Sequence, residues 1–174
     1  MSALHIINAR RSAAEPLSEL MIERGRFVAR FSADSALRVL DLAGRLVLPG
    51  LIETHIHLDK ACILERCQLT EGTLAEAIAQ TRMAKASFSE DDVYARGAQV
   101  LEKAIIQGTT HMRTHVEIDP GIGLTGFRAI QRLKRDYAWA VTLEICVFPQ
   151  EGMLNNPGTE RLLCQALEEG AEVL

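Results

Sequence analysis

The sequence predicts an α/β fold in which a short all-β segment, residues 1–50, precedes alternating strands and helices over residues 51–174. Residues 1–50 hold short apolar runs and turn signals but show no helical period. After Pro49-Gly50, apolar runs of strand length alternate with stretches of helical period. The later units recur at about 30 residues, the size of a βα unit, which indicates parallel strands with right-handed crossovers.

Each segment divides into elements bounded by turn or cap residues. In the first we expect strands at 4–9, 36–42 and 45–48 and a hairpin over 20–31 that turns at Arg24-Gly25-Arg26. In the second we expect strands at 51–57, 109–118 and 138–148 and the start of a further strand at 171–174. Helices are expected from Thr73 in a capping box with Glu76, after Ser89, over 125–136, and from a cap at Thr159.

This order fits both a doubly wound sheet and a (β/α)8 barrel. A barrel usually needs about 250 residues, so on the barrel interpretation the 174 residues form about half of one. The chain would then appear truncated within barrel strand four, at Leu174.

Composition narrows the classes of function. Hydrophobic residues make up 48% and charged residues 24%, as in ordinary globular domains. A net charge of −4 predicts no nucleic-acid partner. No apolar run is long enough for a membrane span, and residues 1–7 lack the pattern of a secretion signal, so we expect no membrane association and a cytoplasmic location.

The strongest chemical signal is His55-Ile56-His57 at the end of a predicted strand. A strand has a side-chain period of two, so both imidazoles point to one side, and Asp59 joins them if the strand continues. Paired imidazoles at a strand end suit a divalent metal, but their chemistry alone does not select which metal. A catalytic site needs about three protein ligands, so two alone would hold a metal weakly.

The next strand places His111, Arg113 and His115 on one face. His115 is nearer the carboxyl end, where it could line an active site or make a structural hydrogen bond. His111 is expected to pack near the other end. Glu117 and Asp119 are expected to be solvated or to cap the strand.

Two further polar residues follow strand ends. Gln150 could cap its loop, or its amide could pair with the N–H and C=O edge of a heterocycle. Lys60 could hold a substrate anion, although exposure to solvent is the simpler expectation.

The run Leu42-x-Gly44-Arg45-Leu46-Val47-Leu48-Pro49-Gly50-Leu51-Ile52-Glu53-Thr54-His55-Ile56-His57 resembles the opening of the amidohydrolase superfamily of metal-dependent hydrolases. Three segments make it similar to the cytosine deaminase branch, which includes enzymes that act on triazine-type rings. These are His55 to Lys60, Met112-Arg113-Thr114-His115-Val116-Glu117, and Val147-Phe148-Pro149-Gln150-Glu151-Gly152.

The resemblance implies β-sandwich strands over residues 1–50, and over 51–174 the first half of a distorted (β/α)8 TIM-like barrel. It implies that His55 and His57 ligate one divalent metal ion, iron or zinc, and that Gln150 binds a small heterocyclic substrate. From its place on the strand alone, His115 is a further candidate for substrate contact. The family reaction is hydrolytic deamination of a pyrimidine- or triazine-like ring by metal-bound hydroxide.

The same resemblance places the acid–base residues and the remaining ligands beyond Leu174, so no catalytic residue is assigned within the chain. We therefore expect the chain alone to be inactive. An open half-barrel has unpaired strand edges and an uncovered apolar face, which predicts a homo-oligomer. Two alternatives stay open: a non-catalytic, truncated fragment that self-associates, and a different amidohydrolase that cleaves an amide or substituted-amine C–N bond.

Overall fold

A computed structural model describes residues 2–174, and the chain divides into two compact units, Met1–Pro49 and Gly50–Leu174. The first is all β and the second alternates strands with helices, so the predicted α/β class is confirmed. In the described residues no helix is both long enough and apolar enough to cross a bilayer.

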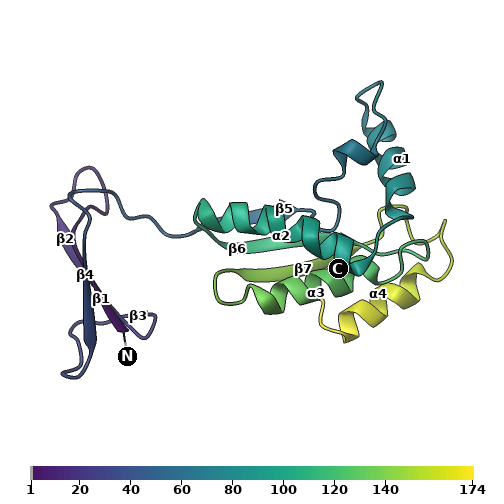
Figure 1. Ribbon diagram of the computed structural model, residues 1–174. Coiled ribbons are helices and arrows are strands. Elements are labelled where there is room, and N and C mark those ends of the chain that lie inside the picture. Colours follow the sequence, from purple (N-terminus) through teal and green to yellow (C-terminus); the bar gives the residue numbers. More distant parts are fainter. Residues whose placement is uncertain (1) are drawn as a thin grey trace. The chain divides into compact units, whose positions relative to one another are not determined.

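The first unit is a four-stranded sheet in the order β3-β2-β1-β4 (Figure 1). Its hairpin turns at Arg24 and Gly25, whose φ angles of 54° and 74° are left-handed, as the predicted turn requires. Neighbouring strands are antiparallel except for the parallel pair β1–β4. The strands are β1 (Ser2–Ala9), β2 (Ser18–Glu23), β3 (Arg26–Phe27) and β4 (Ala36–Asp41).

The strand expected at 45–48 does not form. Leu46 makes only an isolated bridge to Arg10, although Val47 also donates a hydrogen bond to the Arg10 carbonyl. β1 ends at Ala9, so residues 45–48 have no extended strand to pair with beyond Arg10. Pro49, which follows them, has no N–H to donate.

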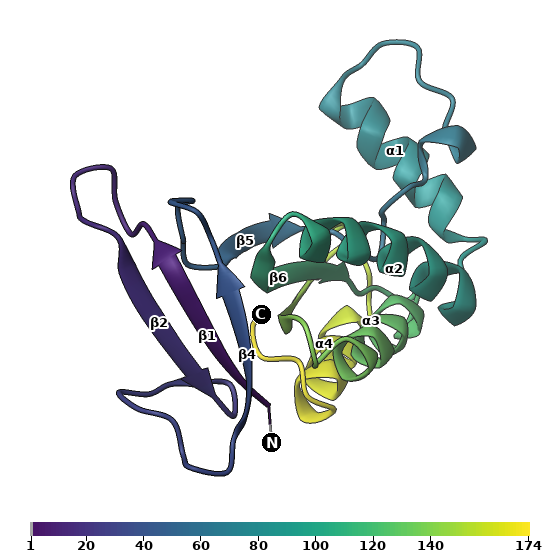
Figure 2. The ribbon, with the colours of Figure 1, turned by 60° about the vertical axis from the view of Figure 1, so that its left-hand side comes forward.

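The second unit contains a parallel three-stranded sheet in the order β5-β6-β7, joined by helices (Figures 1 and 2). Helices α2, α3 and α4 pack on these strands. The elements are β5 (Leu51–Ile56), the 3-10 helix η1 (Leu64–Arg66), α1 (Leu74–Lys85), α2 (Glu90–Ile106), β6 (Thr109–Glu117), α3 (Thr125–Asp136), β7 (Thr142–Phe148) and α4 (Thr159–Glu168).

The core of this unit lies between the sheet and its helices. Alternate strand residues such as Met112, Val116 and Ile145 are buried against Phe127 and other apolar helix side chains. Gly97 allows α2 and α3 to approach closely, because a Cβ at this position would lie 2.7 Å from the Leu133 side chain. The remaining strand residues face away from this core, on the side that carries the candidate site.

Helix starts follow the predicted caps in two of three cases. The side chains of Thr73 and Ser89 accept hydrogen bonds from the N–H groups of the third residues of α1 and α2. α4 differs: its cap is Gly158 at φ 99°, and the Thr159 hydroxyl instead donates to the Asn156 carbonyl. The glycine makes the left-handed turn that a threonine there would resist.

The last two predicted strands are shorter than expected. β7 begins at Thr142 rather than 138, because the preceding residues turn back and Ala140 and Val141 donate to the Tyr137 carbonyl. Residues 171–174 form a parallel bridge between Val173 and Cys146 rather than a strand.

Candidate active site

The carboxyl ends of the three parallel strands bring the predicted site residues together. β5 ends at Ile56, beside His57; β6 ends two residues after His115; and β7 ends two residues before Gln150. The pairing of His115 with Cys146 and of Ile56 with Thr114 sets this alignment. Polar groups from distant parts of the sequence thus share one edge of the sheet, the edge where α/β enzymes place their chemistry.

His55 and His57 lie side by side at this edge, with ring centroids 5.4 Å apart. His57 is half-buried, and its Nδ1 lies 3.0 Å from the backbone oxygen of His115. A carbonyl oxygen only accepts, so Nδ1 carries the proton and Nε2 is left with a free lone pair. His55 is exposed, and its backbone N–H donates to the Glu53 carboxylate.

The electrostatic surroundings keep His57 in the form that binds a metal. Burial, followed by the positive charge of Lys60, lowers the pKa of His57 to about 4. The imidazole is therefore neutral at pH 7, as a metal ligand must be. A carbonyl that holds Nδ1 while Nε2 stays free is the usual outer-shell arrangement of metal-binding histidines, so His57 fits a divalent ion, and the His55 ring beside it offers a second imidazole.

His115 adds a third imidazole from β6. Its ring stacks on that of His55, with centroids 4.0 Å apart and planes inclined by 18°. Its Nδ1 is buried and has no hydrogen-bond partner within the described residues. His111, near the start of β6, is exposed and contacts Thr110, so the expected packing role is not seen.

Asp59 does not join the histidine pair. β5 ends at Ile56, so the strand alternation that would have aligned this carboxylate stops before reaching it. The side chain is instead buried, and its Oδ2 accepts from the Glu117 N–H at 3.0 Å. Burial raises the pKa of Asp59 to about 6. This residue ties the end of β5 to the end of β6.

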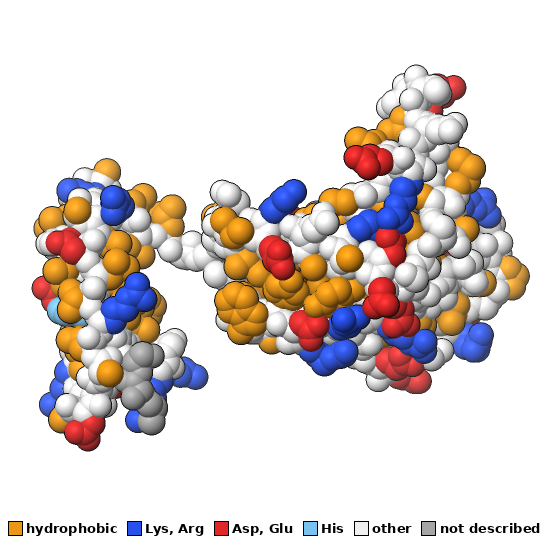
Figure 3. All heavy atoms as spheres, in the orientation of Figure 1, with side chains coloured by type: hydrophobic (Ala, Val, Ile, Leu, Met, Phe, Trp, Pro, Cys, Tyr) orange, Lys and Arg blue, Asp and Glu red, His pale blue; other side chains and the backbone are white. Residues whose placement is uncertain are grey.

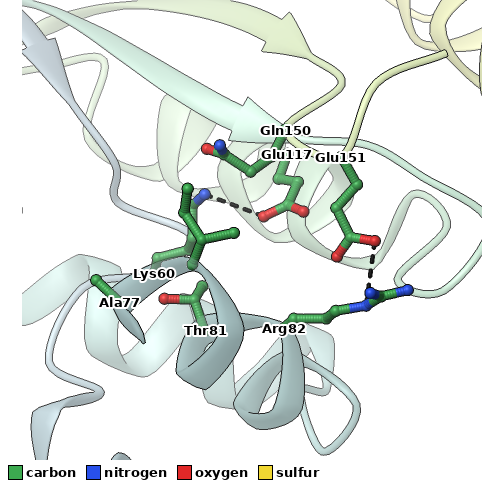
Figure 4. Close-up of a pocket in the computed structure, with 8 residues that line it drawn as sticks. Lys60, Ala77, Thr81, Arg82, Glu117, Gln150 and Glu151 are labelled. Atoms are coloured by element: carbon green, nitrogen blue, oxygen red, sulfur yellow. Dashed lines mark hydrogen bonds and ion pairs between the residues drawn. The ribbon is translucent and has the colours of Figure 1, made fainter. Parts of the chain in front are cut away.

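Gln150 is exposed beside a small pocket of about 110 Å³. Figure 4 shows Gln150, Glu117 and Glu151 on one side of it and residues of α1 on the other. The pocket combines a neutral amide with charged and apolar groups, which is the mixture expected of a site for a small polar ring. Its lining is Lys60, Ala77, Ile78, Thr81, Arg82, Glu117, Gln150 and Glu151.

Lys60 connects this pocket to the histidine pair. Its side chain is only 14% exposed, so the expectation of a solvated lysine is wrong, and Nζ lies 3.0 Å from Glu117 Oε2. Nζ also lies 5.0 Å from the centroid of the Phe148 ring, which in turn lies 5.3 Å from the His57 ring. The Phe148 ring therefore lies between His57 of the histidine pair and Lys60 of the pocket, and it contacts both.

Sequence reasoning missed the charge cluster behind the pocket. Lys85, the last residue of α1, is buried, and its Nζ contacts Glu117 at 2.6 Å, Glu151 at 2.7 Å and the Asp119 carboxylate. Glu117 and Asp119 are buried as well, so neither is solvated. The capping alternative holds for Asp119, whose Oδ1 accepts from the backbone N–H groups two and three residues later. The lysine lies 32 or more residues from each carboxylate, and no local pattern marks it.

The cluster is arranged around an ammonium ion. Among the described residues, Glu117, Asp119 and Glu151 are the group whose ligand atoms converge closely enough for a metal. In this structure Lys85 Nζ contacts all three, so a metal would have to displace it. Burial alone would lower the pKa of Lys85, but hydrogen bonds to Asp119, Glu117 and Glu151 raise it, so the lysine stays protonated.

Comparison with known proteins gives the class of the chain. The family model described as the amidohydrolase family matches residues 38–144, more than half of the sequence. The chain therefore belongs to the amidohydrolase family, as its sequence resemblance predicted.

Two solved structures of hydrolases are similar to this chain over nearly all of its length. N-isopropylammelide isopropylaminohydrolase from Burkholderia multivorans is 32% identical, with a TM-score of 0.84 over 98% of this chain and 44% of that one. A 5-methylcytosine deaminase from Klebsiella pneumoniae, liganded with 5-fluorocytosine, is 32% identical, with a TM-score of 0.84 over 96% of this chain and 41% of that one. These matches support the predicted similarity to the cytosine deaminase branch.

Curated sequences give a consistent result. The uncharacterized protein YahJ of Escherichia coli is 27% identical over 86% of this chain and 34% of its own length. N-isopropylammelide isopropyl amidohydrolase of a Pseudomonas species is 21% identical over 78% of this chain and 35% of its own length. The chain thus spans about a third of these relatives.

Replacing Lys85 with methionine should strongly destabilise the second unit. Three buried or nearly buried carboxylates would lose their shared counter-charge, a change that typically costs about 3–5 kcal/mol. The matched control is Arg82→Met, one turn earlier in α1: Arg82 contacts the same Glu151 but is 67% exposed, so its loss should cost under about 1 kcal/mol. Urea unfolding of both variants measures the difference, and equal stabilities would contradict it.

Proposed function

We propose that these residues supply the metal-binding histidine pair and the ring-binding amide of a hydrolase that deaminates a pyrimidine- or triazine-like ring. The observation that carries the proposal is the meeting of His55, His57 and the Gln150 pocket at one sheet edge. The similarity to a 5-methylcytosine deaminase over 96% of this chain supports the choice of substrate class.

The residues divide the work between metal and substrate. His55 and His57 would hold one divalent ion, iron or zinc, with His57 binding through Nε2. Such an ion, when bound, lowers the pKa of a water molecule and orients it. Gln150 offers one donor and one acceptor to the edge of the ring, and the charge of Lys60 lies in the same pocket.

The proposal concerns the part of a site that this chain provides. The chain covers 41–44% of the two similar structures, so we propose that it corresponds to the first part of a (β/α)8 barrel, residues 51–174, preceded by sandwich strands, residues 1–50. The acid–base groups would then come from a part of the hydrolase outside these residues, and the isolated chain would be inactive. A cytoplasmic location stays a prediction.

A second candidate reaction is the cleavage of a substituted amine from a triazine-type ring. It is favoured by the 32% identity to N-isopropylammelide isopropylaminohydrolase, whose structure matches as well as that of the deaminase. Competition against 5-fluorocytosine separates the two. Stronger displacement by N-isopropylammelide than by cytosine would favour the second reaction.

We also propose that the isolated chain self-associates. On the sheet β5-β6-β7, Leu51 and Ile52 are 54% and 69% exposed, and hydrophobic side chains are visible on the unit's surface in Figure 3. Exposed apolar side chains beside a strand edge favour pairing with a second copy. Light scattering should give a mass above that of one chain, and a monomer at all concentrations would contradict the proposal.

Removal of the histidine pair should weaken metal binding. The double substitution His55→Ala with His57→Ala should weaken zinc affinity by at least about tenfold in titration calorimetry, because imidazoles are the donors available at this edge. The control His111→Ala removes an exposed imidazole from the opposite end of β6 and should leave affinity unchanged. Equal affinity of the double variant and the wild type would place the metal elsewhere.

Loss of the Gln150 amide should weaken ligand binding. The substitution Gln150→Leu should lower the affinity of the zinc-loaded chain for 5-fluorocytosine by about tenfold, because the ring edge loses its hydrogen-bond partners. Fluorine NMR measures the binding. Gln131→Leu on α3, which removes only a bond to the Glu169 carbonyl, is the control. Unaltered binding by Gln150→Leu would show that the amide does not contact the ring.

A further inference from the structure

His115 contacts both members of the histidine pair, and it does so with two different groups. Its ring stacks on His55 at 4.0 Å between centroids, while its backbone oxygen accepts a hydrogen bond from His57 Nδ1 at 3.0 Å. These contacts span 58 to 60 positions of sequence and depend on the pairing of β5 with β6. One residue of β6 therefore contacts two side chains at the end of β5.

The geometry argues against His115 as a third metal ligand. Ligands of one ion converge on a point, whereas the rings of His55 and His115 lie nearly parallel, 18° apart. Among the described residues, the group with converging ligand atoms is the Glu117, Asp119 and Glu151 cluster, and the three imidazoles do not form such a group. The buried Nδ1 of His115 faces no hydrogen-bond partner in the described residues, whereas its ring face packs on His55.

His55 needs such support more than His57 does. His57 is half-buried and fixed by a hydrogen bond through its ring, whereas His55 is exposed and donates a hydrogen bond from its backbone N–H. An exposed imidazole turns among several rotamers unless a neighbour restricts it. The ring of His115 covers one face of the His55 ring and so limits that rotation.

We propose that His115 is a positioning residue that fixes the ring plane of His55 for metal binding, a role that rests on the proposed metal site. Its aromatic face performs this function, and neither ring nitrogen is required. Phenylalanine should therefore replace it, whereas alanine should not. Outer-shell residues that orient ligands typically change metal affinity by about 10–100-fold, which sets the size of the expected effect.

The first arm of the test needs no metal. In NMR spectra of the metal-free chain, the ring current of His115 should displace the His55 ring-proton signals, which His55→Gln assigns. His115→Ala should move these signals toward the values of a free histidine, and His115→Phe should keep them displaced. Unchanged signals in His115→Ala would overturn the proposal, because the rings would then not be stacked in solution.

The second arm measures zinc affinity and the visible spectrum of the cobalt-loaded chain. His115→Ala should bind about tenfold more weakly with an altered cobalt spectrum, while His115→Phe should match the wild type. Equal weakening by phenylalanine and alanine would overturn the proposal, because it would show that a ring nitrogen of His115 is required. If the wild type binds no zinc, the proposed function fails, and the stacking arm alone decides whether His115 positions His55.

Discussion

The parallel pairing of β5, β6 and β7 is the constraint on which the site depends. It brings His57, His115 and Gln150 to one edge, although they are separated by dozens of residues. Gly50 permits the close start of this pairing, because a Cβ there would lie 2.2 Å from the Thr110 side chain. A shift of register by one residue would turn every side chain to the other face and separate the imidazoles.

Charge pairing then holds the helical wall of the pocket in place. Lys85 at the end of α1 contacts carboxylates at or just beyond the ends of β6 and β7, and Arg82 contacts one of them from the same helix. α1 thereby becomes one side of the Gln150 pocket. Lys85 supplies the positive charge in the acid cluster, so these carboxylates hold α1 in place. The histidine pair is the group that offers donor atoms to a metal.

The sequence predicted those parts of the site that follow from local periodicity. Alternation along a strand was enough to pair His55 with His57, and cap residues located the starts of α1 and α2. Features that arise from distant contacts were not predictable. The cluster around Lys85 joins three segments, and the burial of Asp59 depends on where β5 ends. Lys60 looked exposed because its partner Glu117 lies 57 positions away.

This sheet edge presents His57 as a metal donor, because the His115 carbonyl accepts a hydrogen bond from its Nδ1. The most direct measurement is long-range ¹H–¹⁵N NMR of the histidine rings in the metal-free chain at neutral pH, which reports the tautomer of each imidazole. We predict that His57 is a single tautomer protonated at Nδ1, with a lone pair on Nε2. A proton on Nε2, or an equal mixture of both forms, would contradict the account.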